Sequence, residues 1–163
     1  MMRAMVVDFS YDRAALTVDT QYMLGDSLLV APVFSEDGEC TFYLPVGAEW
    51  TDIQTGEVKE GGRWYTQKYD YFGMPLYAKP NSIIVYGDFK NHAEYDYTDN
   101  MKIVVYGLED GKSAETEVYD KDAELAASIK AVRSGDTITV TVSGMDKPFT
   151  VESAQKLNVV ISK

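Results

Sequence analysis

The chain has 163 residues, of which 26 are acidic and 15 basic, so its formal net charge is −11 at pH 7. This charge repels phosphate backbones and anionic lipid headgroups, which argues against nucleic acids and membranes as partners. Hydrophobic residues make up 45% of the chain, too many for a disordered segment, and no apolar run reaches the roughly 18 residues of a transmembrane helix. The composition therefore predicts a soluble globular chain, and its charge does not argue against binding of neutral ligands.

A single cysteine, Cys40, excludes an intramolecular disulfide. Because Glu39 and Thr41 flank it, we predict a strand residue and not a nucleophile. The first residues lack the long apolar region and the small-residue cleavage site of a signal peptide. We therefore expect a cytoplasmic protein, or a chain whose natural N-terminus lies upstream.

The first twenty residues contain an apolar segment, 3–9, predicted as a strand, and one helical turn that starts near Asp12. A strand and a single turn cannot bury side chains as apolar as Met5 and Phe9 by themselves. We therefore interpret this segment as the tail of a larger domain. Without that domain, residues 1–20 are expected to be poorly ordered or unusually packed.

The longest apolar run, residues 21–33, predicts the strand around which the remaining strands are arranged. Residues 28–33 show no polar alternation, which is typical of a strand covered on both faces. Pro32 lacks a backbone N–H, so it belongs at the end of this strand or at a bulge.

Short strands and turns follow as far as about residue 90. Clusters of turn-forming residues, such as 35–38 and 61–62, separate segments rich in aromatic and β-branched side chains. The strands predicted in this part are residues 40–45, a segment around Trp50, and residues 57–60, 63–69, 75–80 and 82–86.

A polar break at residues 88–92 precedes a second series of strands with a more regular alternation. In residues 137–142, for example, Ile138, Val140 and Val142 point to one face and three threonines to the other. We therefore predict an all-β fold with two consecutive small antiparallel β-sandwich units and little helix. The strands expected in the second unit are residues 101–106, 116–119, 125–132, 137–142, 150–152 and 157–161.

Patterns for catalysis, metals and cofactors are weak. His92 is the only histidine, and no nucleophile elbow accompanies it, so a serine or cysteine hydrolase site is not supported. One histidine and one cysteine do not supply a zinc site. Asp120, Asp122 and Glu124 lack the glycine and the final glutamate of a calcium loop, so we interpret them as a hairpin turn. We expect neither a metal nor another cofactor.

A glycoside hydrolase needs two carboxyl groups on opposite sides of the scissile bond, but the acidic residues here fall mostly in turns. The aromatic residues between 64 and 77 fit either an inter-sheet core or a stacking platform for sugar rings. We favour the core and keep Trp64, Tyr65 and Tyr69 as candidates for sugar stacking.

A series of motifs begins with residues 2–9 and 21–33. It continues in order with Phe42-Tyr43-Leu44-Pro45, Trp50-x-Asp52-x-x-Thr55-Gly56, Gly61-Gly62-x-Trp64 and Pro75-Leu76-Tyr77-x-x-Pro80-Asn81-Ser82-Ile83-Ile84. The series resembles the end of the catalytic barrel and the following sandwich domain of glycoside hydrolase family 31. Asn81 stands where many members have glycine, and asparagine tolerates the same left-handed backbone.

Three further motifs, Tyr95-Asp96-Tyr97, Val105-Tyr106-x-Leu108-x-Asp110-Gly111 and Asp146-Lys147-Pro148-Phe149-Thr150-Val151, are similar to the distal sandwich of the family's α-xylosidases. The resemblance implies that residues 1–24 are the end of a catalytic (β/α)8 barrel, residues 25–90 a proximal β-sandwich and residues 91–163 a distal β-sandwich.

The resemblance also implies a parent enzyme that hydrolyses α-linked glucosides or xylosides with retention, using two closely spaced aspartates. The motifs of both aspartates are absent from this sequence. Asp52 follows Trp50 and Thr51 as in the nucleophile's setting, but the residues after it fit a turn behind the barrel. We therefore expect no catalytic residue and predict that the chain alone is inactive on glycosides.

Our first hypothesis is the non-catalytic C-terminal portion of such an enzyme, most closely of α-xylosidase type, which supports the catalytic barrel and forms subunit contacts in a homo-oligomer. An α-linked oligosaccharide would then bind only to the complete enzyme. Arg3 and Asp26 are expected to form an ion pair at the junction between the barrel and the sandwich. The alternative is that these side chains extend to the rim of the active site. The other hypotheses are a free-standing carbohydrate-binding module that uses the aromatic strand 63–72, and a surface interaction protein.

Overall fold

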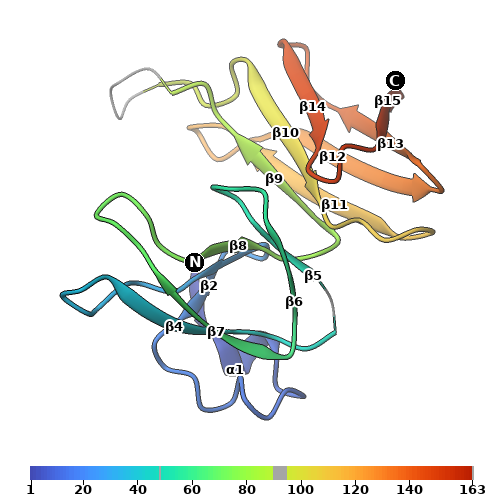
Figure 1. Ribbon diagram of the computed structural model, residues 1–163. Coiled ribbons are helices and arrows are strands. Elements are labelled where there is room, and N and C mark those ends of the chain that lie inside the picture. Colours follow the sequence, from blue (N-terminus) through green and yellow to red (C-terminus); the bar gives the residue numbers. More distant parts are fainter. Residues whose placement is uncertain (48, 90–94, 163) are drawn as a thin grey trace. The chain divides into compact units, whose positions relative to one another are not determined.

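The computed structural model describes residues 1–47, 49–89 and 95–162, and it consists almost entirely of β-strands and their connections (Figure 1). Among these residues the helix α1 (Met5–Asp8) is the one α-helical segment, and it has only four residues. The prediction of an all-β chain with little helix is therefore confirmed. None of the described residues forms a helix with the length and hydropathy that crossing a bilayer requires.

The chain divides into two compact units, Met1–Pro80 and Asn81–Lys163. This division comes earlier in the chain than residue 90, where the polar break suggested it. The reason is that β9 (Ser82–Tyr86) pairs with β10 (Met101–Tyr106), which lies beyond the break. Part of the break itself, including His92, lies outside the described residues.

The first unit begins with β1 (Met2–Ala4) and α1, so the apolar segment 3–9 is not a single strand as we expected. Met5 and Phe9 are four residues apart, and a helical turn places side chains at this spacing on the same side. Both side chains are buried in the core of the unit. Their burial counts against the expectation that residues 1–20 pack poorly.

Residues 21–33 form a hairpin and not one strand. Its two arms are β2 (Tyr22–Leu24) and β3 (Leu28–Val30), which pair antiparallel. Gly25 makes the turn with φ of +61°, a conformation that glycine adopts without steric cost. As predicted, both faces of β3 are covered, since the successive residues Leu29 and Val30 are both buried, and the pairing of β3 ends before Pro32.

The first unit contains a six-stranded sheet with the order β1-β2-β3-β8-β5-β6 and a separate pair, β4-β7. All of its strand pairs are antiparallel. The strands not yet introduced are β4 (Glu39–Leu44), β5 (Glu49–Asp52), β6 (Val58–Glu60), β7 (Arg63–Lys68) and β8 (Leu76–Ala78).

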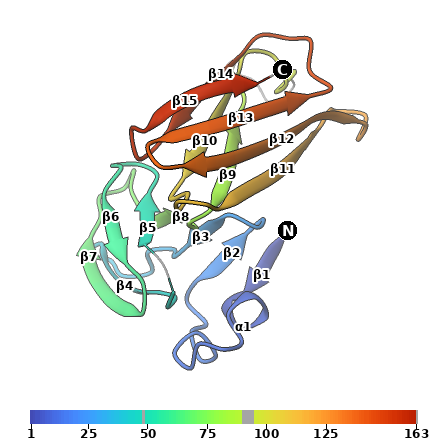
Figure 2. The same ribbon diagram turned by 90° about the vertical axis from the view of Figure 1, so that its right-hand side faces the viewer.

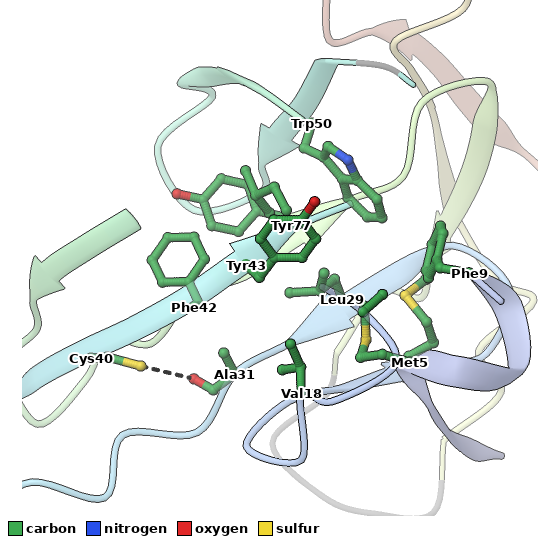
Figure 3. Close-up of a cluster of buried hydrophobic side chains, with 13 residues drawn as sticks. Met5, Phe9, Val18, Leu29, Ala31, Cys40, Phe42, Tyr43, Trp50 and Tyr77 are labelled. Carbon is green, nitrogen blue, oxygen red and sulfur yellow. Dashed lines mark hydrogen bonds between the residues drawn. The ribbon is translucent and has the colours of Figure 1, made fainter. Parts of the chain in front are cut away.

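The core of the first unit lies between these strands and the N-terminal segment (Figure 3). Leu29 of β3 lies in it with Phe42, whose ring is 5.3 Å from that of Tyr77. Phe9, directly after α1, reaches Trp50 of β5 with ring centroids 5.9 Å apart. The N-terminal segment is thus an integral part of this core.

Two sheets form the second unit, with the orders β14-β10-β9 and β11-β12-β13-β15 (Figure 2). The pairs β10-β14 and β13-β15 are parallel, a feature that the hairpin spacing did not indicate. The remaining pairs are antiparallel, as predicted. The strands of this unit that are new here are β11 (Ser113–Tyr119), β12 (Leu125–Ser134), β13 (Thr137–Ser143), β14 (Phe149–Ser153) and β15 (Asn158–Ser162).

The core of the second unit draws on both of its sheets. Ile103 of β10 comes from one sheet, and Ile129 of β12 and Ile138 of β13 come from the other. Ile138 and Val140 are fully buried, which confirms the alternation predicted for residues 137–142. Ile161 of β15, by contrast, is half exposed, and β15 is an edge strand of its sheet.

Candidate functional site

The aromatic residues considered for sugar stacking do not share one exposed face. Trp64 and Tyr65 are successive residues of β7, and successive residues of a strand point to opposite faces. The Trp64 ring is about half exposed and lies 5.2 Å from the ring of Tyr43. Tyr65 is partly buried, and its ring stacks on that of Phe42 at 5.8 Å.

Tyr69, the third candidate, packs against the core of the first unit. Its hydroxyl donates a hydrogen bond of 2.9 Å to Oε1 of Gln67, and the hydroxyl of Tyr77 reaches the same oxygen at 3.3 Å. Burial raises the pKa of Tyr69 to about 12. These are the contacts of a core side chain, the interpretation that we favoured from the sequence.

Asp12 is a buried carboxylate that connects the N-terminal segment to β4 and the turn after it. Its oxygens accept hydrogen bonds from the hydroxyl of Tyr43 at 3.0 and 3.1 Å and from the backbone N–H of Val46 at 2.8 Å. It also accepts the N–H of Ala14, which closes the local turn. Burial, followed by the bond to Asp12, raises the pKa of Tyr43 to about 12.

Gln21 makes a second buried connection to the same strand. Its side-chain amide donates to the carbonyl oxygen of Tyr43 at 2.7 Å and accepts the N–H of Tyr43 at 2.8 Å. The side chain thereby replaces a neighbouring strand at this position of β4. Buried backbone groups need such partners, because an unpaired donor or acceptor costs about 1–3 kcal/mol.

Asp52 lies at the end of β5 and is buried. Its Oδ1 accepts the backbone N–H groups of Gln54 and Thr55, and its carbonyl oxygen accepts the N–H of Gly56. This is the turn predicted from the sequence. The carboxylate is therefore engaged with its own backbone and is not directed at a substrate.

Arg3 forms ion pairs with two aspartates of the first unit. Its Nε lies 3.0 Å from Oδ2 of Asp8, and its Nη1 lies 2.7 Å from Oδ1 of Asp26. These hydrogen bonds raise the pKa of Arg3. The predicted pairing of Arg3 with Asp26 is confirmed, and Asp8 was not foreseen as a partner.

Exposed apolar side chains gather near β1 and α1. Met2, Val6, Leu16 and Phe34 are exposed, and together they line a hollow of about 570 Å³. We call these four residues the N-terminal apolar surface. The sequence indicated part of this surface, since Val6 belongs to the apolar segment 3–9, which the N-terminal residues alone were not expected to bury.

Cys40 and the acidic turn at Asp120 have structural roles. The Cys40 thiol is buried in β4 against the carbonyl oxygens of Ala31 and Pro32, and burial raises the pKa of this thiol (Figure 3).

Asp120 Oδ1 accepts the N–H groups of Asp122 and Glu124, as expected for a hairpin turn. Within residues 1–47, 49–89 and 95–162, no three or more His, Cys, Asp or Glu side chains gather as a metal site would require.

In the second unit, Lys147 joins two of the motifs found in the sequence. Its ammonium group lies 2.6 Å from Asp96, 2.9 Å from Asp99 and 2.9 Å from the hydroxyl of Thr98. Asp96 also accepts both the N–H and the hydroxyl of Thr98. The bond to Lys147, followed by the bonds to Thr98, holds the pKa of Asp96 far below its ordinary value.

The motif around Leu108 and Asp110 forms a second polar cluster of this unit. The Arg133 guanidinium donates to the carbonyl oxygen of Leu108 at 2.8 Å, and Asp110 accepts the N–H of Gly135 at 2.7 Å. Asn81, with φ of +55°, adopts the left-handed backbone that was expected of it. The hydrogen bonds of Arg133 and Asp110 thus fix turns of the second unit.

Comparison with protein families gives two matches along the chain. Residues 1–84 match the model described as "Glycosyl hydrolase family 31 C-terminal domain". Residues 96–162 match the model described as "Alpha-xylosidase YicI, C-terminal domain". The order of the two matches is the order that the motifs predicted, and the resemblance stated from the sequence is confirmed.

Individual relatives agree with the family models. The chain is 35% identical over 154 residues to alpha-xylosidase XylQ of Lactiplantibacillus pentosus, covering 93% of this chain and 20% of that protein. It is 32% identical over 161 residues to an alpha-xylosidase of Emericella nidulans, covering 90% and 20% respectively. The chain therefore spans about a fifth of the length of these curated relatives.

Solved structures show the same architecture. The GH31 dextranase of Flavobacterium johnsoniae superposes with a TM-score of 0.76 over 93% of this chain and 21% of that one. At 22% identity this likeness concerns the fold alone. It supports the β-rich architecture described above.

Proposed function

This chain belongs to glycosyl hydrolase family 31, as its C-terminal region, and from that premise we propose that it is the non-catalytic β-sandwich portion of a retaining α-glycosidase of α-xylosidase type. Its role is to support the catalytic barrel of the complete enzyme. The N-terminal apolar surface is the single observation that carries this proposal, because it provides a place for that barrel to pack.

The buried carboxylates favour a structural role over catalysis. Retaining glycosidases hold two carboxyl groups about 5–5.5 Å apart, with one as nucleophile and one as acid and base. Among the described residues, the carboxylates that are buried belong to Asp12 and Asp52. Asp12 accepts bonds from Tyr43 and Val46, and Asp52 accepts bonds from its own turn. Both are thus engaged in maintaining the fold.

The exposed apolar side chains of the N-terminal apolar surface favour a partner that covers them in the complete enzyme. Contiguous apolar surface of this kind is unusual on an isolated soluble protein and is typical of an interface. The relatives are about five times longer than the match, so a large domain is available to cover it. In this proposal residues 1–24 are the end of the barrel, and Asp12 and Gln21 connect that end to the proximal sandwich.

Subunit contacts form a further part of the proposal. Val160 and Ile161 of β15 are each about half exposed, and β15 is an edge strand of its sheet. An exposed edge with apolar side chains is suited to pairing with another chain. By contrast, a free carbohydrate-binding module built on Trp64 and Tyr65 is not favoured, because the two rings face opposite ways.

Association in trans tests the proposal. A truncated XylQ that lacks the matching C-terminal segment is mixed with the 163-residue chain, and complex formation is followed by sedimentation velocity. We expect a one-to-one complex that Leu16→Asp abolishes, because a charge in an apolar interface loses its hydration.

The matched control for that experiment is Val58→Asp. Val58 is exposed to a similar degree but lies on β6, at the opposite end of the sheet from β1. The control should bind like the unmodified chain. Absence of a complex, or equal weakening by both substitutions, would count against a supporting role of the N-terminal apolar surface.

A further inference from the structure

The loop between β7 and β8 carries the two most exposed aromatic side chains among the described residues. Tyr71 is 96% exposed and Phe72 is 89% exposed. Their ring centroids are 5.5 Å apart, and the ring planes are nearly perpendicular at 89°. The two rings therefore form a corner whose surfaces are open to solvent and belong to neither hydrophobic core.

Backbone hydrogen bonds hold this loop at both ends. The N–H of Tyr69 donates to the carbonyl oxygen of Gly38 at 2.9 Å, and the carbonyl oxygen of Pro75 accepts from Ala31 at 3.1 Å. Within the loop, Asp70 Oδ1 accepts the N–H of Phe72 at 2.9 Å. A loop fixed in this way loses little conformational entropy when a ligand binds.

Gly38 allows this close contact between the loop and the preceding turn. Its φ is +80°, and a Cβ atom added to it would lie 2.2 Å from the carbonyl oxygen of Tyr69. Only glycine fits a position that combines a left-handed backbone with so close an approach. The position of the aromatic corner is thus determined by the fold.

A hollow of about 630 Å³ adjoins the aromatic corner. Tyr71 and Asp70 line it from the loop, and the exposed acidic residues Glu36 and Asp37 line it from the turn before β4. Ionised carboxylates accept hydrogen bonds but do not donate them. The site thus combines flat apolar rings with acceptors for hydroxyl groups.

We propose that this hollow and the Tyr71–Phe72 corner bind a neutral α-linked oligosaccharide, as an ancillary site of the enzyme. The apolar C–H face of a pyranose ring packs on an aromatic ring, while its hydroxyls donate to carboxylates. The inference goes beyond the supporting role, and it rests on the proposed function only for the choice of sugar.

The acidic lining favours a sugar over a protein surface. Burying three carboxylates in an apolar protein interface removes their hydration without supplying a charge partner. A neutral sugar offers hydroxyl donors and leaves the carboxylates accessible to water. A ligand that is itself anionic would be repelled by the net charge of −11.

Titration of the 163-residue chain with isomaltotriose, followed by amide chemical shifts in NMR, tests this inference. We expect saturable shifts at Asp70, Tyr71 and Phe72 with a dissociation constant in the millimolar range. Tyr71→Ala and Phe72→Ala should each weaken binding about tenfold, the effect of losing one stacking contact. Glu36→Gln should weaken it severalfold, since the amide is a poorer acceptor.

Trp64→Ala is the control, because its ring is exposed but lies outside the corner and the hollow. It should leave the affinity unchanged, and dispersed spectra of every variant establish that it is folded. The inference is wrong if isomaltotriose causes no saturable shift, if Trp64→Ala weakens binding as much as Tyr71→Ala, or if the loop signals depend on protein concentration, which indicates a second copy as the occupant. Complex formation with truncated XylQ does not depend on these outcomes, so a failure here is distinguishable from a failure of the proposed function.

Discussion

Among individual residues, Asp12 connects two parts of the chain that are more than thirty positions apart. Its carboxylate meets the Tyr43 hydroxyl and the Val46 N–H, so a single side chain fixes the N-terminal segment against β4. The sequence placed Asp12 at the start of a helical turn, and the bond from Ala14 agrees with that role. The long-range bonds were beyond prediction, because they depend on how the core brings the segments together.

Replacing Asp12 by Asn should destabilise the first unit by about 2–4 kcal/mol, because hydrogen bonds to a buried charged acceptor contribute about 1.5–3 kcal/mol each. Urea unfolding followed by near-ultraviolet circular dichroism measures the change. Asp19→Asn, at an exposed position nearby, should change stability by less than about 0.5 kcal/mol. Equal stabilities of the two variants would disprove the role assigned to Asp12.

Asp96 makes the stability of the second unit depend on pH in the acid range. Its pKa is held low by Lys147 and Thr98, so the folded state prefers the ionised carboxylate. The stabilisation is therefore complete above the ordinary aspartate pKa of about 4 and is lost as the pH falls below it. The protection factors of the β10 and β14 amides against hydrogen exchange, which correct for the slower intrinsic exchange in acid, should therefore fall between about pH 5 and pH 3.

Asp96→Asn removes the titrating group, so the protection factors of this variant should be lower at neutral pH and should change less on acidification. Asp122→Asn, in the exposed hairpin turn, serves as the control and should retain the acid dependence. A variant at Asp96 with the full acid dependence would show that other carboxylates cause it.

Among the elements, strand prediction succeeded where residues alternate and turns are short. Residues 101–106 and 82–86 were predicted with the bounds of β10 and β9, and 137–142 differs from β13 by one residue. The hairpin of β2 and β3 was missed because apolar residues on both faces concealed the turn at Gly25. The parallel pairs could not be predicted from hairpin spacing, since they join strands that are not consecutive.

Gln21 supports β4 in place of a neighbouring strand, which leads to a prediction for that element. Gln21→Glu keeps an acceptor for the Tyr43 N–H but loses the donor to the Tyr43 carbonyl oxygen. We expect a loss of about 1–3 kcal/mol in the free energy of unfolding. Gln54→Glu, at an exposed turn position, should be neutral in the same urea titration. A neutral result at Gln21 would mean that the bridge contributes nothing to stability.

For the whole molecule, the sequence predicted the family and the all-β class, while the candidate site required coordinates. The alternation of side chains along a strand indicates from the sequence alone that Trp64 and Tyr65 face opposite ways. The exposure of Tyr71 and Phe72 was not predictable, because an aromatic run has the same composition whether it lies in a core or on a surface. Likewise, the N-terminal apolar surface is identified by exposure and not by residue type.

The central claim is that this chain completes an α-glycosidase without supplying its chemistry. The most direct test is a chimera in which the matching C-terminal segment of XylQ is replaced by this chain, assayed with a chromogenic α-xyloside beside the chain alone and the truncated XylQ. We predict turnover by the chimera and none by the 163-residue chain, with the truncated protein inactive or rapidly inactivated. Turnover by the isolated chain, or an inactive chimera that is nonetheless folded, would contradict the claim.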